Sequence, residues 1–513
     1  MSAVARGLEA AALLLALLLL AILATGGWTL AGLSLTRPED VLLALVVVTA
    51  ARAAVAPLQP PSVAPRRVVV AGVAAYALAM GFITVTRHRA LLTHALDLGY
   101  YVQVVWAIAH GLAARVTLPP MHAWGDHFSP ILYLLIPLGW LSSVGAGLLL
   151  AQTAILAAGG LAVYGFARHR LEDDGLAAGF ALVYLVNPSL HGINVRDVHP
   201  QAFVIPLLIA AALALDRRRW GWCVVALVLA AACREDATIA LLGFGLWAML
   251  ARRRWAVGAG IAVAAVALLL VDTRVLMPYF RGEPYPHLIK RYAHLGDSVP
   301  DVLLTLGLRP WRWLPVVLEP AKLVYLVAML APLAFLPLLA PAALAGALPG
   351  LAVNLLSFDR VLFHHRTQYQ AFVLPFLVLA AVDGCLILRE WLTRRGSTRV
   401  SPRAVLTAAF LVSVALTSRT VNDLMVTRWR LGPEQRAARA LAARIPPDVP
   451  VSVNERLQPH LAMRPEAYIF PTAVERSQWV LEMDSVLARR PLPPGLVVEA
   501  RERGWTLLRR TPN

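Results

Sequence analysis

Apolar stretches alternate with short basic groups along most of the chain. Runs such as AALLLALLLLAILA and VAAVALLLV fit the rule that about 20 apolar residues span the hydrocarbon core of a bilayer. Segments of this kind predict about thirteen membrane-spanning helices, at residues 8–30, 41–57, 67–86, 144–167, 175–188, 201–215, 220–233, 237–250, 256–273, 322–340, 342–357, 369–388 and 404–418. We therefore expect a mainly α, polytopic membrane protein.

Two features depart from a series of simple spans. Several middle segments are nearer to about 14 residues than to 20, which favours tilted or partly re-entrant helices. The stretch SPILYLLIPLGWL, residues 129–141, would break the alternation of basic groups if it crossed the membrane. It is therefore expected to be half-inserted or interfacial.

Composition and charge support the membrane class. Hydrophobic residues make up 59% of the chain and charged residues 15%, whereas soluble domains carry about 25% charged residues. The net charge of +17 comes from arginines in short groups between apolar segments, which the positive-inside rule assigns to the cytoplasmic face. This distribution argues against a nucleic-acid partner. It predicts a plasma-membrane protein with a cytoplasmic N-terminus.

The same pattern divides the chain into three parts. Residues 1–60 are expected to form an additional N-terminal hairpin, and residues 61–418 the main transmembrane domain, with outer loops at 87–128 and 274–320. After this domain polar residues become frequent, prolines cluster in RIPPDVP and RPLPPG, and short alternating runs such as VPVSVN appear. Residues 419–513 therefore predict a small extracytoplasmic α/β domain.

The stretch HALDLGYYVQVVWAIAHG is the first candidate for chemistry. Its periodicity predicts an amphipathic helix lying in the outer interface, with Gln103 on the polar side and Asp97 at the start. Asp97 either caps this helix and has no chemical role, or points into a polar cavity. The pattern leaves both interpretations open.

Further polar groups fall in segments that the topology places on the same outer side. Each has a structural alternative, such as a helix cap or a buried ion pair. The three ionisable residues of CREDATIA favour a functional site, because charges at membrane depth are costly. The candidates are Asp126, His127, Arg196, His199, Arg234, Glu235, Asp236, Lys290, Arg291, His365 and Arg366. Together they predict an outer cavity suited to an anionic lipid-linked substrate.

No pattern indicates a metal or a nucleotide. The adjacent histidines of HHRTQYQ would point about 100° apart on a helix, and no HExxH or CxxC motif accompanies them. The three cysteines, Cys223, Cys233 and Cys385, lie in apolar segments, and no glycine-rich phosphate loop is present. We therefore predict no cofactor. A divalent metal is compatible with the carboxylates, but no ligand set requires one.

Several consecutive segments resemble the DUF2079 family of predicted bacterial membrane proteins. The resemblance covers about residues 90–390 and rests on DLGYYVQVVWAIAHG, DHFSPILYLLIPLGWL, NPSLHGINVRDVHPQAFVIPLL, REDATIALLGFGLW, LAPLAFLPLLAPAALAGALPGLAVNLLS and HHRTQYQAFVLPFLVLAAVDG, in this order. The tail PVSVNERLQPHLAMRPEAYIFP resembles the outer domain that often follows. This family is in turn similar to the GT-C superfamily of integral-membrane glycosyltransferases, which carry an acidic motif in the first large outer loop.

The resemblance implies a bacterial enzyme that moves a sugar from a polyprenyl-phosphate donor to a lipid or cell-envelope glycan acceptor on the outer face. Asp97 matches the acidic motif in chain order, as a lone carboxylate preceded by about three spans instead of one. It is the expected general base, with Glu235 and Asp236 as alternatives. The expected phosphate ligands are Arg234, His365 and Arg366, and the residues expected to orient substrate are His127 and His199.

Two other classes of function stay open. A lipid or glycan transporter or flippase would carry ionisable residues near the bilayer midplane and inverted repeats, whereas here the charges gather toward one face. A non-catalytic envelope scaffold would rely on residues 419–513 to bind glycan or a partner. Substitution of Asp97 should abolish function only if the protein is a glycosyltransferase.

Overall fold

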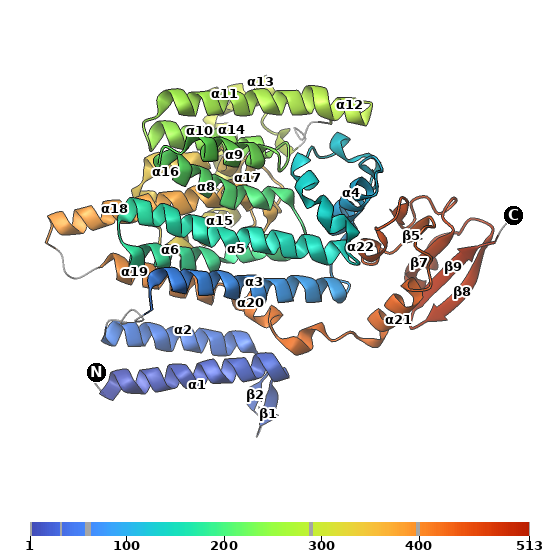
Figure 1. The fold of residues 1–513 in the computed structure, drawn as a ribbon, viewed down its shortest axis with the longest axis horizontal. Helices are drawn as coiled ribbons and strands as arrows, with labels where there is room; N and C mark the ends of the chain where they lie inside the picture. The colour runs from blue at the N-terminus through green and yellow to red at the C-terminus, as the bar shows by residue number, and fades with distance from the viewer. Residues whose placement is uncertain (1–2, 31–32, 57–62, 287–290, 397–400, 512–513) are drawn as a thin grey trace.

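The structure is a computed structural model that describes residues 3–30, 33–56, 63–286, 291–396 and 401–511. Most helices run side by side along the long axis of the molecule, and a small sheet domain stands at one end (Figure 1). Every range that was predicted to span the membrane contains helix. The structure thus confirms a polytopic α-helical membrane protein with a small C-terminal sheet region.

Among the described residues, four helices are long and apolar enough to cross a membrane alone. They are α1 (Ala3–Thr25), α3 (Pro65–Arg89), α5 (Val144–Leu171) and the helix Trp255–Arg281, which comprises α11 (Trp255–Val271), η5 (Asp272–Leu276) and α12 (Met277–Arg281). Two bent pairs meet the same test: α6 (Asp174–Leu185) with α7 (Pro188–Val195), and α14 (Pro310–Val317) with Pro320–Leu333, which includes α15 (Pro320–Leu330). The other helices of the bundle are α2 (Pro38–Val55), α8 (Val204–Asp216), α9 (Trp220–Ala231), α10 (Ala237–Leu250), α16 (Pro341–Leu344), α17 (Leu348–Leu355), α18 (Leu374–Arg394) and α19 (Pro402–Ala415).

Local sequence signals set many helix starts. The Oγ atom of Ser143 accepts the N–H of Ala146 at the start of α5, and Oδ1 of Asp173 accepts the N–H of Leu176 at the start of α6. Prolines occupy the first turn of α2, α3 and α19, where the missing N–H donor costs nothing. Because such signals are local, the sequence located these helices well.

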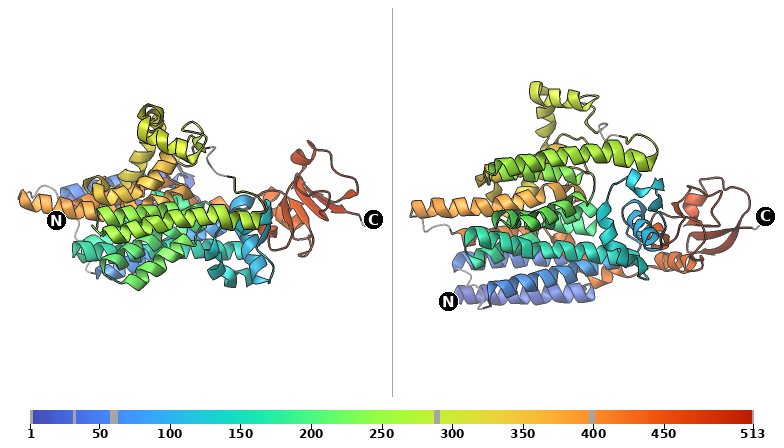
Figure 2. Two further views of the ribbon diagram at one scale, coloured as in Figure 1. Left: turned by 90° about the horizontal axis from the view of Figure 1, so that it is seen from above. Right: turned by 45° about the horizontal axis from the view of Figure 1, so that its top comes forward.

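The two ends of the bundle differ in charge. The basic end carries the arginine groups at 168–170, 217–219 and 252–254. The opposite end, called the distal end, carries α4 (Tyr100–Ala109) and the C-terminal domain (Figures 1 and 2). The 3₁₀ segment η3 (Pro130–Trp140) packs on α4 at this end. Its interfacial position stays a prediction.

A buried ion network joins several elements at the basic end. Asp383 on α18 accepts hydrogen bonds from Nη1 of Arg252 at 2.7 Å and from Nε of Arg170 at 2.9 Å. Nε of Arg252 also lies 2.9 Å from Asp216 at the end of α8, and its guanidinium lies over the ring of Trp247. The side chains of Asp216, Arg252 and Asp383 are 5%, 8% and 9% exposed. Their charges are therefore compensated by one another and not by water.

The sequence predicted that residues 274–320 form an outer loop. Part of this segment lies away from the distal end. α13 (Val299–Leu308) and α14 project sideways from the middle of the bundle (Figure 2). α14 and the helix Pro320–Leu333 form one apolar pair that is bent by 61°, so α14 does not continue the direction of that helix.

The N-terminal hairpin packs on the outside of the bundle (Figure 1). α1 packs against α2, and α2 contacts α19 and the short helix α20 (Ser418–Asp423). Arg52 on α2 is paired with Glu9 on α1 at 2.6 Å. A two-stranded hairpin, β1 (Trp28–Leu30) and β2 (Leu33–Leu35), connects the two helices.

The C-terminal domain contains a five-stranded sheet of order β6-β5-β7-β9-β8. β5 is parallel to both of its neighbours, whereas β9 is antiparallel to β7 and β8. The strands are β5 (Val451–Val453), β6 (Ala467–Ile469), β7 (Trp479–Met483), β8 (Leu496–Glu502) and β9 (Trp505–Arg510), and the helices are α21 (Pro433–Ala442), α22 (Gln458–Leu461) and α23 (Asp484–Leu487). A separate hairpin, β3 (Arg115–Thr117) and β4 (Pro120–His122), follows α4.

Candidate functional site

Asp97 lies in a single π-helical turn, η1 (Ala95–Gly99), which leads directly into α4. The cap position of this turn is occupied by His94, so the interpretation of Asp97 as the helix cap is wrong. Oδ1 of Asp97 lies 3.3 Å from Nε2 of His199, which precedes the 3₁₀ turn η4 (Pro200–Phe203). The side chain of Asp97 is 44% exposed and that of His199 5%. Asp97 is therefore an accessible carboxylate beside a fixed imidazole.

A second pair of imidazole and carboxylate lies next to the first. Oδ2 of Asp197 accepts the backbone N–H of His94 at 2.9 Å and lies 2.9 Å from Nδ1 of the same residue. The side chain of Asp197 is 2% exposed, and its Oδ1 atom is buried without a hydrogen-bond partner. Asp197 also has a φ of +57°, in the left-handed region that non-glycine residues rarely adopt. A strained backbone around buried polar atoms is typical of functional sites.

These pairs also offer a set of metal ligands. One ligand atom from each of His94, Asp97 and Asp197 lies within 4.8 Å of the other two. One imidazole and two carboxylates suit a divalent transition-metal cation. The donor set therefore fits such an ion. The sequence pointed to no metal, because His94 and Asp197 are 103 positions apart.

The surroundings keep Asp97 ionised. Burial raises its pKa, but the hydrogen bond and charge of His199, with the charges of His94 and Arg196, outweigh burial. The net pKa of Asp97 therefore lies below its ordinary value. The carboxylate can accept a hydrogen bond from an alcohol throughout the physiological pH range.

Four arginines from distant parts of the chain gather beside the two pairs. Burial lowers the pKa of Arg366, and the charges of Arg419 and Arg196 lower it further, so both lie within electrostatic range of Arg366. Arg87, at the end of α3, lies within electrostatic range of Arg419 and Asp197. We call Arg87, Arg196, Arg366 and Arg419 the arginine group.

One carboxylate, Asp423, lies among these cations and compensates part of their charge. Asp423, which is within electrostatic range of Arg366 and Arg87, is itself paired with Arg428 at 2.9 Å. Like charges that outnumber the carboxylates among them form a natural binding site for an anion.

A glycine allows the loop with Arg366 to reach this position. A Cβ atom built on Gly192 of α7 would lie 2.3 Å from Cβ and 2.5 Å from Cα of Arg366. Any other residue at position 192 would push the loop away from α7. The close approach therefore depends on the absence of a side chain.

His365, a predicted phosphate ligand, lies in the same loop. Burial lowers its pKa to about 4, and the charges of His364 and Arg366 act in the same direction. The imidazole of His365 is therefore neutral at pH 7. It can contribute a hydrogen bond to a phosphate but no positive charge.

The remaining acidic candidates form a separate buried charge cluster before α10. Nε of Arg234 donates to Asp236 at 2.8 Å, and a second guanidinium nitrogen contacts the same carboxylate. Glu235 lies 3.0 Å from Nδ1 of His127 and accepts the N–H of Phe128 at 3.0 Å. The side chains of Arg234, Glu235 and Asp236 are 9%, 5% and 17% exposed. These charges compensate one another, as in a structural ion pair.

The pair of Glu235 and His127 should make stability depend on pH. Burial lowers the pKa of His127, but the charge and hydrogen bond of Glu235 raise it above its ordinary 6.5. Burial raises the pKa of Glu235, but His127 and Arg234 lower it below its ordinary 4.5. The stabilisation is fully present between about pH 4.5 and 6.5, is lost as pH rises through the raised pKa of His127, and is lost as pH falls through the lowered pKa of Glu235.

We expect His127→Gln to lower the thermal unfolding temperature more at about pH 6 than at about pH 9. The measurement is thermal unfolding of wild type and variant in the same detergent at both pH values. His169→Gln, at an exposed histidine of the basic end, serves as the matched control and should show no such difference. An equal effect of His127→Gln at both pH values would contradict the prediction.

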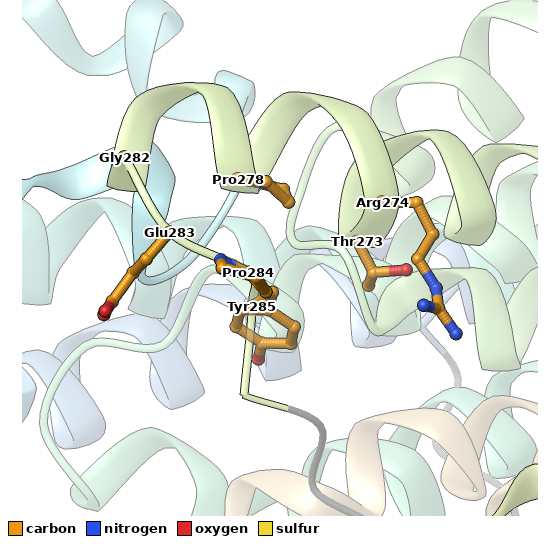
Figure 3. A pocket seen from close by; sticks show the side chains of 7 residues that line it. All are labelled: Thr273, Arg274, Pro278, Gly282, Glu283, Pro284 and Tyr285. Atoms are coloured by element: carbon orange, nitrogen blue, oxygen red, sulfur yellow. The ribbon is translucent and has the colours of Figure 1, made fainter.

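Tyr101 on α4 lies between the buried charge cluster and the Asp97 pairs, since it is within electrostatic range of Glu235 and of Asp97. A cavity of about 350 Å³ adjoins the buried charge cluster near Tyr285. Figure 3 shows the side chain of Glu283 pointing away from the other side chains that line this cavity. It is lined by Thr273, Arg274, Pro278, Gly282, Glu283, Pro284 and Tyr285. This cavity does not include Asp97. The accessible carboxylate, and not the size of a cavity, therefore identifies the candidate site.

Two predicted site residues have other roles. Gln103 is fully buried: its amide nitrogen donates to the carbonyls of Arg464 and Pro465, and its Oε1 atom accepts the N–H of Thr117. It therefore joins α4 to the C-terminal domain and presents no free atom to a substrate. Arg291 is paired with Asp359 at 3.5 Å.

The remaining predicted site residues are Asp126 and Lys290. Asp126 is half-buried in the loop beside His127 and within electrostatic range of it. Lys290 lies outside the described residues.

Sequence comparison identifies the family. The sequence pattern of the DUF2079 predicted membrane proteins matches residues 87–506. The chain belongs to the DUF2079 family. The sequence of this DUF2079 protein matches no curated protein. The match begins just before Asp97 and extends through the C-terminal domain, so both belong to the family's common region.

The fold of the DUF2079 protein is similar to solved structures of ArnT from Cupriavidus metallidurans. The structure of ArnT bound to undecaprenyl phosphate aligns with a TM-score of 0.52 at 14% sequence identity, over 86% of this chain and 97% of that chain. The apo structure of ArnT aligns with a TM-score of 0.51 over the same shares. The likeness concerns the fold alone.

Sequence reasoning missed four residues that the DUF2079 fold brings to Asp97. His94 and Asp197 stand in segments whose polar residues were noted, yet only packing shows that they form a pair. Arg87 and Arg419 end and begin helices at the distal end, where the sequence gives no sign that they approach each other.

Proposed function

We propose that this DUF2079 protein is a membrane glycosyltransferase that uses a polyprenyl-phosphate sugar as donor and a glycan or lipid as acceptor on the outer face. Asp97 accepts the proton of the acceptor hydroxyl as its oxygen forms a bond to the anomeric carbon of the sugar. The bond between that carbon and the phosphate oxygen breaks, and polyprenyl phosphate leaves with the electron pair.

The observation that carries this proposal is the placement of an accessible, ionised Asp97 beside the arginine group. His199 orients the carboxylate through the 3.3 Å contact. Glu235 and Asp236 are less suitable as bases, because both are already occupied by cations in the buried charge cluster. Asp97 is therefore the carboxylate that we assign to proton transfer.

The arginine group would bind the phosphate of the donor. Arg196, Arg366 and Arg419 outnumber Asp423, the carboxylate that lies among them, so they can stabilise the negative charge that develops on the leaving phosphate. Arg234 is less suited to this role, because its charge is taken up by Asp236. The neighbouring ArnT structure with bound undecaprenyl phosphate supports a lipid phosphate as the ligand class.

The direct test is sugar transfer by the purified protein in lipid, measured with a panel of radiolabelled polyprenyl-phosphate sugars. We expect transfer from at least one donor of the panel to a glycan or lipid acceptor. If the folded protein transfers sugar from none of them, the proposed function is wrong and the transporter and scaffold classes become the better hypotheses.

Arg366→Gln should raise the KM for the donor by about 10- to 100-fold, because a hydrogen bond to a charged group contributes about 1.5–3 kcal/mol. The measurement is initial rate against donor concentration. Arg360→Gln, at an exposed arginine of the same loop, is the matched control and should leave KM within about twofold. Equal effects of the two substitutions would remove Arg366 from the phosphate site.

A further inference from the structure

The turn that carries Asp97 is held on one side by the C-terminal domain. α22 of that domain packs directly on η1. The side chain of Gln458 is fully buried against Gly99, the last residue of η1: a Cβ atom built on Gly99 would lie 1.8 Å from Oε1 of Gln458. Nε2 of Gln458 donates to the carbonyl of Ala467 at 3.1 Å, which fixes the side chain in this position.

Further contacts join the same two parts on both sides of η1. Before it, Leu91 is buried in the core of the C-terminal domain. After it, Gln103 and Thr117 bond to backbone carbonyls of residues 464–467, with 3.0 Å from Nε2 of Gln103 to Pro465 and 2.6 Å from Oγ1 of Thr117 to Ala467. Ala462 lies in one apolar cluster with Leu98. The chain before and after Asp97 is therefore packed against the C-terminal domain.

The opposite side of η1 meets the membrane domain, through polar contacts at Asp97 and His94 and through apolar packing of Leu98 against α5. Asp97 contacts His199, and His94 contacts Asp197, both from the segment between α7 and α8. A π-helical turn is uncommon and often marks a functional position. Its geometry depends on what packs on it, and here that is Gln458.

We infer that the C-terminal domain is a positioning element for catalysis, which holds η1 through the contact of Gln458 with Gly99 and thereby places the carboxylate of Asp97. This inference rests on the proposed function for its effect on rate. Gln458 touches neither substrate nor the reacting carboxylate; it acts through the backbone of η1.

A double-variant cycle tests this contact. Gly99→Ala places a methyl group where the amide of Gln458 lies, and it should lower kcat by about 10- to 100-fold, because a displacement of about 1 Å costs up to about 100-fold. The KM for the donor should change by less than about twofold. In Gly99→Ala/Gln458→Ala the methyl group occupies the vacated space, and kcat should recover to within about threefold of wild type.

Two matched controls accompany the cycle. Gly307→Ala tests the same substitution at a glycine with open space around it, and Gln478→Ala removes an exposed glutamine of the same domain. Both should leave kcat unchanged. Recovery of kcat in the double variant is not expected from a substitution that merely weakens folding.

Hydrogen–deuterium exchange of residues 95–100 in the full-length protein separates this inference from the proposed function. Gly99→Ala should speed exchange there and the double variant should restore it, whatever the reaction. Unchanged exchange in Gly99→Ala would show that the contact of Gln458 with Gly99 does not hold η1. Faster exchange with an unchanged kcat overturns the positioning role, and failure of the double variant to recover kcat overturns the role of Gln458. If wild type shows no transfer at all, the proposed function fails. The exchange data alone then decide whether the contact of Gln458 with Gly99 holds η1.

Discussion

Asp97→Asn is expected to lower kcat for sugar transfer by about 10²–10⁴-fold, with little change in the KM for the donor. Asparagine keeps an oxygen that can accept a hydrogen bond from His199, so the turn should keep its shape, but it cannot accept the acceptor's proton. The measurement is the initial rate of transfer from the donor that wild type uses, in the same lipid.

Asp297→Asn, at an exposed aspartate outside the candidate site, is the matched control and should leave the rate unchanged. Because the pKa of Asp97 lies below the ordinary value of 3.8, the rate should stay level as pH falls from 7 and should decline only in strongly acidic solution. A kcat within about twofold of wild type in Asp97→Asn would remove Asp97 from proton transfer and would direct attention to Glu235 and Asp236.

Asp383→Asn should destabilise the protein by about 3–5 kcal/mol, because it leaves two buried or half-buried guanidinium groups without their shared counterion. Arg252 would keep Asp216, but Arg170 would lose the carboxylate that it contacts at 2.9 Å. The expected result is a clear fall in the denaturant concentration at which the protein unfolds in micelles.

Asp174→Asn is the control for this network. Asp174 forms an ion pair with Arg168 at the same end of the bundle, but their side chains are 47% and 57% exposed. Exposed pairs contribute about 0–1 kcal/mol, so this change should have little effect. A similar loss of stability in both variants would show that burial of the Asp383 network is not what matters.

The membrane class and the positions of the helices follow from the sequence because they depend on neighbouring residues. A run of apolar residues such as Ala3–Thr25 must be shielded from water wherever it lies, and a cap such as Asp173 acts on an N–H group three residues away. The change to polar and alternating sequence likewise located the C-terminal domain. The sideways course of α13 and α14 was not predicted, because the sequence of both helices is also compatible with an outer loop.

The candidate site was predicted only in part. Asp97 and His199 were both singled out, although their contact joins positions that are 102 residues apart. Gln103 shares a helix with Asp97 and looked equally suited to substrate, but its partners come from positions more than 360 residues away. Helical periodicity shows which side of α4 is polar and cannot show what covers that side.

The sequence by itself determined a polytopic helical membrane protein, the family, and a set of polar residues that apolar surroundings make costly. Only the tertiary structure divided that set into an accessible group around Asp97 and a buried charge cluster around Arg234, and only it brought Asp197, Arg87 and Arg419 to the first. The physical reason is range. Hydrophobic runs and helix caps act within a few residues, whereas the partner, exposure and ionisation of a side chain depend on the packing of helices that are distant in the chain.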